Sequence, residues 1–472
     1  MSLHSICALC FACFSLLIFA SMRYLVLLVF ALFFLEKIAA QPSITPRQVT
    51  LSESLTLAID NSGQLKKARL DREGFEERVR EGRSNAYPQI NLNFNADYYP
   101  ELPTTLLPGS LFNQGDQPYI PAQFNLPWQF TAQLQVQQQI YNEAARRGVP
   151  AVNVTRSVYD LLTERSEEEV IANTATIFYQ MLQTEQLLHT VDANRLKLDT
   201  LRHIAELQVS TGYAIPIDVK RIRVARTNLE TQRQNLLGAI SSLRQTLQLL
   251  CGVPFEQPLE LVDDRSNPAA DSTRWLALQI EPETTTEHRL LLRNMELNRI
   301  QVNSLRAEAL PSVSAYTTAF YQAQRSSLDK VFNIGRRWYG MAVVGVRVVV
   351  PVFDGFRRVH KIKLLNIEGQ KLETDRVQLE GAKKLEFRQA REQVLNALRS
   401  LHSQEDNVVL AREITEKMFF QYQEGLVPLS ELLNTQTAIA EAETNYWQQV
   451  FTYRLAVVKL LKAAGRLEDL KG

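Results

Sequence analysis

The histidine and cysteine residues of this 472-residue chain do not form a catalytic or metal-binding pattern. Five of the six histidines are spread from His189 to His402 without the close spacing that metal ligands need. No glycine-rich phosphate-binding loop follows a predicted strand. Beyond residue 40 Cys251 is the single cysteine, so no disulfide can form within that part of the chain. We therefore expect no enzyme, no cofactor and no metal.

Regularly spaced amide side chains occupy two predicted strands instead. Alternate residues of a strand share one face, and the opposite face of both strands is apolar. Amides are poor strand formers on a dry surface, but they suit a wall in contact with water, which favours an aqueous pore lining. A soluble antiparallel sheet also alternates, so both interpretations stay open. The candidate pore-lining residues are Asn91, Asn93, Asn95, Gln133, Gln135 and Gln137.

The chain contains one long unit twice, each with two strands followed by a helical hairpin. Strands are predicted at about 87–99 and 128–141, and again at about 311–322 and 339–353. Each has about the 9 to 11 residues with which a tilted strand crosses an outer membrane. Four strands are too few to enclose a lumen, so either three chains supply twelve strands or the sheet is an ordinary soluble one.

Long helices follow each pair of strands. Residues 151–211 contain neither glycine nor proline and would extend roughly 90 Å as a helix. The predicted hairpins cover about 144–250 and 355–465, and the segment Gly212–Gly252 aligns without a gap to Gly425–Gly465. A glycine followed by a proline is a helix stop signal, and it occurs at both turns. The spacing of apolar residues is that of antiparallel coiled coils.

The order of these elements divides the chain into four parts. Residues 1–40 are predicted to be a signal peptide, with Met22 as a possible true start. Residues 41–262 form the first repeat, 263–282 a linker and equatorial segment, and 283–472 the second repeat. The long stretch from Pro100 to Pro127 contains six prolines and is predicted to be a loop without helix or paired strand.

Charge argues against nucleic acid as a partner. Lysine and arginine total 52 residues, and aspartate and glutamate total 51, so the chain has no overall basic excess.

Signal peptide, duplicated strand pairs and helical hairpins together resemble the TolC family of outer-membrane efflux proteins. The resemblance implies a mixed, mainly α fold with long coiled-coil hairpins and four strands per chain. Three chains would form a twelve-stranded transmembrane β-barrel on a periplasmic α-helical barrel. The function would be a passive exit duct in the outer membrane for efflux or type I secretion, joined to a periplasmic adaptor and an inner-membrane pump. The matching segments are Thr50–Asn61, Ala309–Val313, Val350–Gly355 and Tyr422–Leu433.

The resemblance also implies a periplasmic entrance at the turns of the two hairpins. Glu431 and Asn434 would line its constriction, with Asn434 in place of the usual acid, and Asp218 matches the acid at the tip of the first hairpin. Val427 stands where a basic ion-pair partner is expected, which weakens a closed-state lock. The alternative function is a periplasmic coiled-coil scaffold or adaptor without a pore. The hairpin tips that would contact an adaptor are Gly212, Pro216, Gly425 and Pro428.

Overall fold

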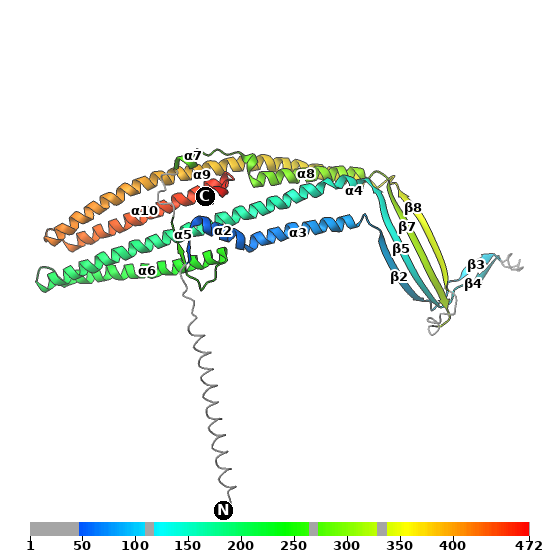
Figure 1. Cartoon of the computed structure of the whole chain (residues 1–472), viewed down its shortest axis with the longest axis horizontal. Helices are drawn as coiled ribbons and strands as arrows, with labels where there is room; N and C mark the ends of the chain where they lie inside the picture. The colour runs from blue at the N-terminus through cyan, green and yellow to red at the C-terminus, as the bar shows by residue number, and fades with distance from the viewer. Residues whose placement is uncertain (1–46, 109–117, 264–271, 328–337, 472) are drawn as a thin grey trace, which may run out of the picture.

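The computed structural model describes residues 47–108, 118–263, 272–327 and 338–471. The predicted signal peptide over residues 1–40 lies outside this range. The described chain is elongated, with a bundle of long helices at one end and a curved sheet at the other (Figure 1).

Two antiparallel helical hairpins form most of the length. The first consists of α5 (Pro150–Ser210, 61 residues) and α6 (Pro216–Cys251), and the second of α9 (Arg357–Gln423) and α10 (Leu429–Ala463). Both turns point to the end opposite the sheet (Figure 1). The predicted long helices are therefore confirmed. None of the described helices is both long enough and apolar enough to cross a membrane.

Shorter helices precede each pair of strands; the sequence predicted helices in the first repeat, but not their limits. Helices α2 (Leu51–Asn61) and α3 (Gly63–Ser84) stand before the first pair, and α8 (Thr286–Ala307) before the second. Close packing of α8 on α9 explains one glycine inside α9, because a Cβ at Gly369 would lie 3.0 Å from the side-chain oxygen of Asn298. The remaining short helices are α4 (Glu143–Gly148), α7 (Ser272–Leu276), η2 (Pro282–Thr284) and η4 (Leu467–Leu470).

Four antiparallel strands form the main sheet in the order β2-β5-β7-β8. The last strand, β8, ends at Val349 and not near residue 353 as predicted, because Pro351 has no N–H to continue the ladder. The outer edges of β2 and β8 have no partner strand in the described part of the chain. The bounds are β2 (Gln89–Tyr98), β5 (Trp128–Asn142), β7 (Ser312–Arg325) and β8 (Tyr339–Val349).

The proline-rich stretch contains a two-stranded ribbon, so the expectation of a loop without paired strands is wrong. Strands β3 (Thr105–Pro108) and β4 (Tyr119–Ala122) pair antiparallel. Both strands are edges of this ribbon, and an edge strand tolerates proline where its nitrogen points away from the partner. A further pair, β1 (Arg47–Val49) with β6 (Leu259–Leu261), runs parallel at mid-length.

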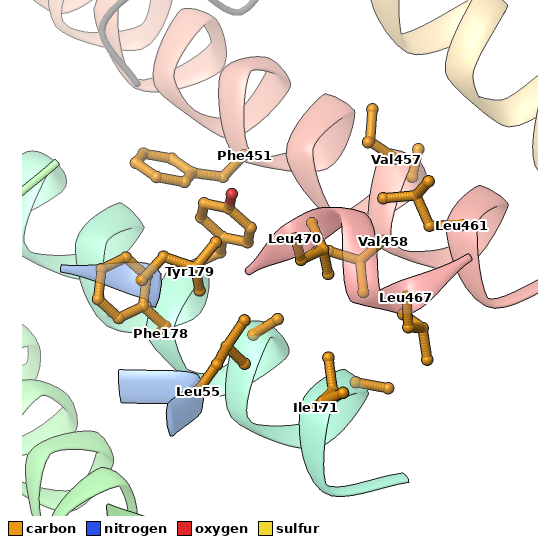
Figure 2. Packing of buried hydrophobic residues seen from close by; sticks show 14 of the residues in the cluster. Leu55, Ile171, Phe178, Tyr179, Phe451, Val457, Val458, Leu461, Leu467 and Leu470 are labelled. Atoms are coloured by element: carbon orange, nitrogen blue, oxygen red, sulfur yellow. The ribbon is translucent and has the colours of Figure 1, made fainter. Parts of the chain in front are cut away.

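The main hydrophobic core lies at mid-length, where the ends of the returning helices meet the N-terminal helix. Phe178 and Tyr179 of α5 pack with Leu55 of α2 and Phe451 of α10 (Figure 2). Trp275 is 4% exposed and belongs to this core. Within the predicted equatorial segment, residues 264–271 lie outside the described ranges.

Candidate pore and entrance

Both hairpin turns are built in the same way. Two residues after each long helix stands a glycine, Gly212 or Gly425, whose φ angle of 81° or 71° lies in the left-handed region that favours glycine. The backbone N–H of Tyr213 donates to Gln208 at 2.8 Å, and that of Leu426 donates to Gln421 at 2.9 Å. These bonds satisfy carbonyls at the helix ends.

The returning helices begin at the two prolines that the sequence marked. Pro216 is the first residue of α6, and Pro428 caps α10 with extended backbone. Because proline fixes φ and has no N–H, it suits the start of a helix. Both prolines and both tip glycines are exposed, so this end of the molecule is accessible.

A separate apolar cluster holds the two hairpins together near their tips. Leu201 of α5, Ile222 of α6 and Leu432 of α10 are each at most 1% exposed. We call this set the tip cluster; its buried members are Leu198, Leu201, Ala205, Ile222, Tyr422, Leu429 and Leu432. It does not include residues of the mid-length core, so the tips are stabilised by their own contacts.

The predicted entrance residues divide into two groups. Glu431 and Asn434 lie exposed on one face of α10, three residues apart, and Glu431 has no ion pair among the described residues. Asp218 is partly buried and lies 3.4 Å (Oδ1) from Nη1 of Arg221. Val427 packs against the tip cluster, so its position supplies apolar contact and no cation.

Tyr422, which the sequence did not single out, is buried in the tip cluster near the predicted entrance residues. It is 5% exposed, and its hydroxyl has no hydrogen-bond partner in the described structure. Burial raises the pKa of this phenol, and the nearby Asp218 carboxylate raises it further. The structure therefore brings an acid of the first hairpin close to a neutral hydroxyl of the second. The sequence shows that Tyr422 stands about one helical turn before Gly425. No local pattern connected it with Asp218, which lies some 200 positions earlier in the chain.

Strand register places the predicted pore-lining amides on one face of the sheet. Asn91 lies directly opposite Gln135, and Asn93 opposite Gln133. Residues directly opposite in an antiparallel pair share a face, so all six predicted amides do so. On the other face Leu92 pairs with Leu134, and this face continues over β7 and β8 through Ala319, Ala342, Val344 and Val346. The two surfaces are called the amide face and the apolar face below.

The described residues contain no group of histidine, cysteine or acidic side chains that could hold a metal ion. Cys251 lies in the mid-length core, 1% exposed, with Sγ 3.5 Å from the carbonyl oxygen of Ser54.

Comparison with known proteins places this architecture among outer-membrane efflux proteins. The profile described as "Outer membrane efflux protein" matches residues 292–466. Outer membrane protein TolC of Escherichia coli (strain K12) is 20% identical over 421 residues, which cover 86% of this chain and 80% of that protein. Proteases secretion protein PrtF of Dickeya chrysanthemi is 21% identical over 315 residues, covering 65% of this chain and 64% of that protein.

Solved structures agree with this assignment at the level of the fold. The outer membrane protein VceC of Vibrio cholerae superposes with a TM-score of 0.66 at 16% identity, over 88% of this chain and 96% of that one. The CmeC outer membrane channel of Campylobacter jejuni gives a TM-score of 0.67 at 14% identity, over 88% and 85% of the two chains. The match over residues 292–466 and these relatives therefore identify the chain as an efflux channel of the outer membrane.

Proposed function

We propose that three copies of this chain form one continuous exit duct that takes cargo from an inner-membrane pump, through a periplasmic adaptor, across the outer membrane. Family membership already implies a trimeric channel that works with efflux partners. The proposal adds where this chain contacts lipid, water and partners. The observation that carries it is a four-stranded sheet with two open edges, in which β2 and β5 carry amides on one face and Leu, Ile, Phe and Val side chains on the other.

The unpaired edges of the sheet, at β2 and β8, are the first observation that supports a trimer. A long strand with unpaired N–H and C=O groups is a template for pairing with another chain, and closure into a barrel removes that exposure. In the order β2-β5-β7-β8, successive strands are antiparallel, so β8 of one protomer can pair antiparallel with β2 of the next. Three protomers then supply twelve strands, enough for an aqueous lumen, whereas four strands do not enclose one.

The two faces of the sheet then have defined surroundings. The amide face lines the lumen, because amide groups keep hydrogen bonds with water there. The apolar face contacts outer-membrane lipid, where Ile90, Leu92 and Phe94 lie between 61% and 73% exposed in the single chain. Burial of this surface in hydrocarbon removes it from water and favours insertion.

The hairpin tips form the periplasmic entrance in this proposal. Three Glu431 carboxylates around one axis make an acidic ring that favours cations, and Asn434 adds no charge. The exposed turns around Gly212, Pro216, Gly425 and Pro428 offer the adaptor its docking surface. The Asp218 carboxylate of one hairpin lies near enough to Tyr422 of the other hairpin to raise the pKa of its phenol.

Cysteine substitution at neighbouring residues of β2 tests the orientation directly. Asn93→Cys puts a thiol on the amide face, and Leu92→Cys is its matched control on the apolar face. Trimers purified in detergent are inserted into planar bilayers and exposed to a charged, membrane-impermeant thiosulfonate reagent. We expect Asn93→Cys to react and lose conductance, while Leu92→Cys keeps its conductance. Equal reactivity of both thiols, or a protein that stays monomeric in plain buffer, would refute the duct and favour the periplasmic scaffold.

A further inference from the structure

One arginine lies on the amide face at the end of the sheet next to the helices. Arg347 of β8 is directly opposite Ser314 of β7, which is in turn opposite Gln139 of β5. Two residues along, Gly345 is opposite Tyr316, and Tyr316 is opposite Gln137. Because alternate residues share a face, Arg347 and Tyr316 lie on the same side as Gln137.

The ring of Tyr316 packs against Gly345 and makes a cation–π contact with Arg347. A Cβ at Gly345 would come within 2.7 Å of Cζ of Tyr316, so the ring occupies the space that a larger residue would fill. The guanidinium carbon of Arg347 lies 5.2 Å from the centroid of the same ring. This is the distance range of a cation–π contact, which orients the guanidinium without neutralising its charge.

The charge of Arg347 has no local compensation. No carboxylate in the described part of the chain forms an ion pair with it. The acidic residue on the same face, Asp97, is opposite Gln129 at the other end of the sheet. Gln139 lies ten positions after Gln129 on β5, or roughly 30 Å along the strand. The side chain is exposed, so its donors are free to contact solute.

We infer that the Arg347 side chains of three protomers form a cationic ring at the inner end of the barrel lumen. The ring selects for anions and for cargo that carries carboxylate or phosphate groups. This inference rests on the proposed trimeric duct and adds a second filter of opposite sign to the acidic ring at the tips. The guanidinium fork matches the geometry of carboxylate and phosphate. A ring of one sign in a narrow passage raises the local concentration of the opposite ion.

Reversal potentials of wild-type and variant trimers in planar bilayers under a KCl gradient test the ring. Three unit charges within about one Debye length of the axis at 0.1 M salt change the permeability ratio of potassium to chloride by about three- to fivefold. Arg347→Gln should therefore raise the potassium-to-chloride permeability ratio by that factor. Arg347→Lys is the matched control, since it keeps the charge, and it should leave the ratio within twofold of wild type.

A second variant tests how the guanidinium is held. Gly345→Ala should displace the Tyr316 ring and shift the ratio in the same direction as Arg347→Gln, but by less. An unchanged permeability ratio in Gly345→Ala would show that the aromatic ring of Tyr316 does not position Arg347. An unchanged ratio in Arg347→Gln would overturn the cationic ring while leaving the duct intact. Absence of any wild-type conductance would instead overturn the proposed function itself.

Discussion

Deletion of three buried carbons at the hairpin tips should loosen the entrance without affecting the rest of the molecule. Leu432 is completely buried in the tip cluster, between α5, α6 and the end of α9. Leu426 lies six residues earlier, in the adjoining turn, and is 73% exposed. Leu432→Ala and Leu426→Ala therefore remove the same atoms from opposite environments within one tip.

The difference in burial gives the expected magnitude. Leucine-to-alanine changes in a packed core cost about 2 to 5 kcal/mol, from lost transfer free energy and the cavity left behind. Exposed substitutions away from special features stay within about 0.5 kcal/mol. The tip cluster shares no residue with the mid-length core. We therefore expect the loss of stability in Leu432→Ala to appear as local opening of the two hairpins. A loss of 2 kcal/mol raises the open population by about thirtyfold.

Limited proteolysis measures this opening. Lys220 and Arg221 are exposed on the second turn of α6, next to the buried Ile222, but trypsin needs an unwound segment. When opening and closing are fast, the cleavage rate follows the population of the open form. We expect cleavage at these two residues to accelerate at least about thirtyfold in Leu432→Ala and less than about threefold in Leu426→Ala. Hydrogen exchange of the α6 amides should follow the same order.

Two results would contradict this reasoning. Equal acceleration in both variants would show that burial in the single chain does not determine the stability of the tip. An unchanged cleavage rate in Leu432→Ala would show that contacts outside the tip cluster, such as those with neighbouring protomers, hold the hairpins closed. The thermal unfolding midpoint of the mid-length core should stay nearly constant in both variants.

The remaining predictions concern three separate residues. Glu431→Gln should reduce the cation selectivity of single channels in a planar bilayer, because it removes the charge from the exposed acidic position on α10; identical reversal potentials would exclude this residue from the entrance filter. Glu143 accepts hydrogen bonds from Arg146 and Arg147, which hold its pKa at about 2. Because this pKa is lowered on folding, the ionised carboxylate stabilises the folded state above the unfolded-state pKa of about 4.3. That stabilisation is lost as pH falls toward about 2. Glu143→Gln should therefore lower the unfolding temperature more at pH 6 than at pH 3, and a larger effect at pH 3 would contradict the assignment. Burial raises the pKa of the Cys251 thiol from 9.0 to about 11, so its thiolate fraction at pH 7.5 is about 100-fold below that of an ordinary thiol. Mass spectrometry should then detect iodoacetamide labelling of this residue only after denaturation, and rapid labelling of the folded protein would refute its burial.

Much of the architecture was predictable because its signals are local. A glycine that takes positive φ at Gly212 and Gly425, followed by a proline, ends a helix wherever it occurs in a fold. Alternation along β2 assigned its two faces before any partner strand was known, since the side-chain period of a strand does not depend on pairing. Strand β2 ends at Tyr98 and β5 begins at Trp128, within one residue of the limits of about 99 and 128 that this alternation suggested.

Errors occurred where pairing or packing overrides local preference. The ribbon of β3 and β4 forms although Pro108 and Pro121 disfavour strands, because each strand needs hydrogen bonds on one side only. Helix α3 was not resolved, since its exposed and charged surface shows a weak apolar stripe, with Leu65, Phe75 and Val79 as its buried residues.

The sequence by itself determined the helical hairpins, the two-faced strands and the positions of the turns, because each depends on residues close together in the chain. Tertiary structure alone decided which distant residues meet. Asp218 approaches Tyr422 only because α5 and α6 pack against α9 and α10 through the tip cluster. Arg347 meets the ring of Tyr316 only because the register of β7 with β8 sets Tyr316 opposite Gly345. Helix packing and strand register are fixed by the combined burial of many side chains, and no short segment of sequence contains that information.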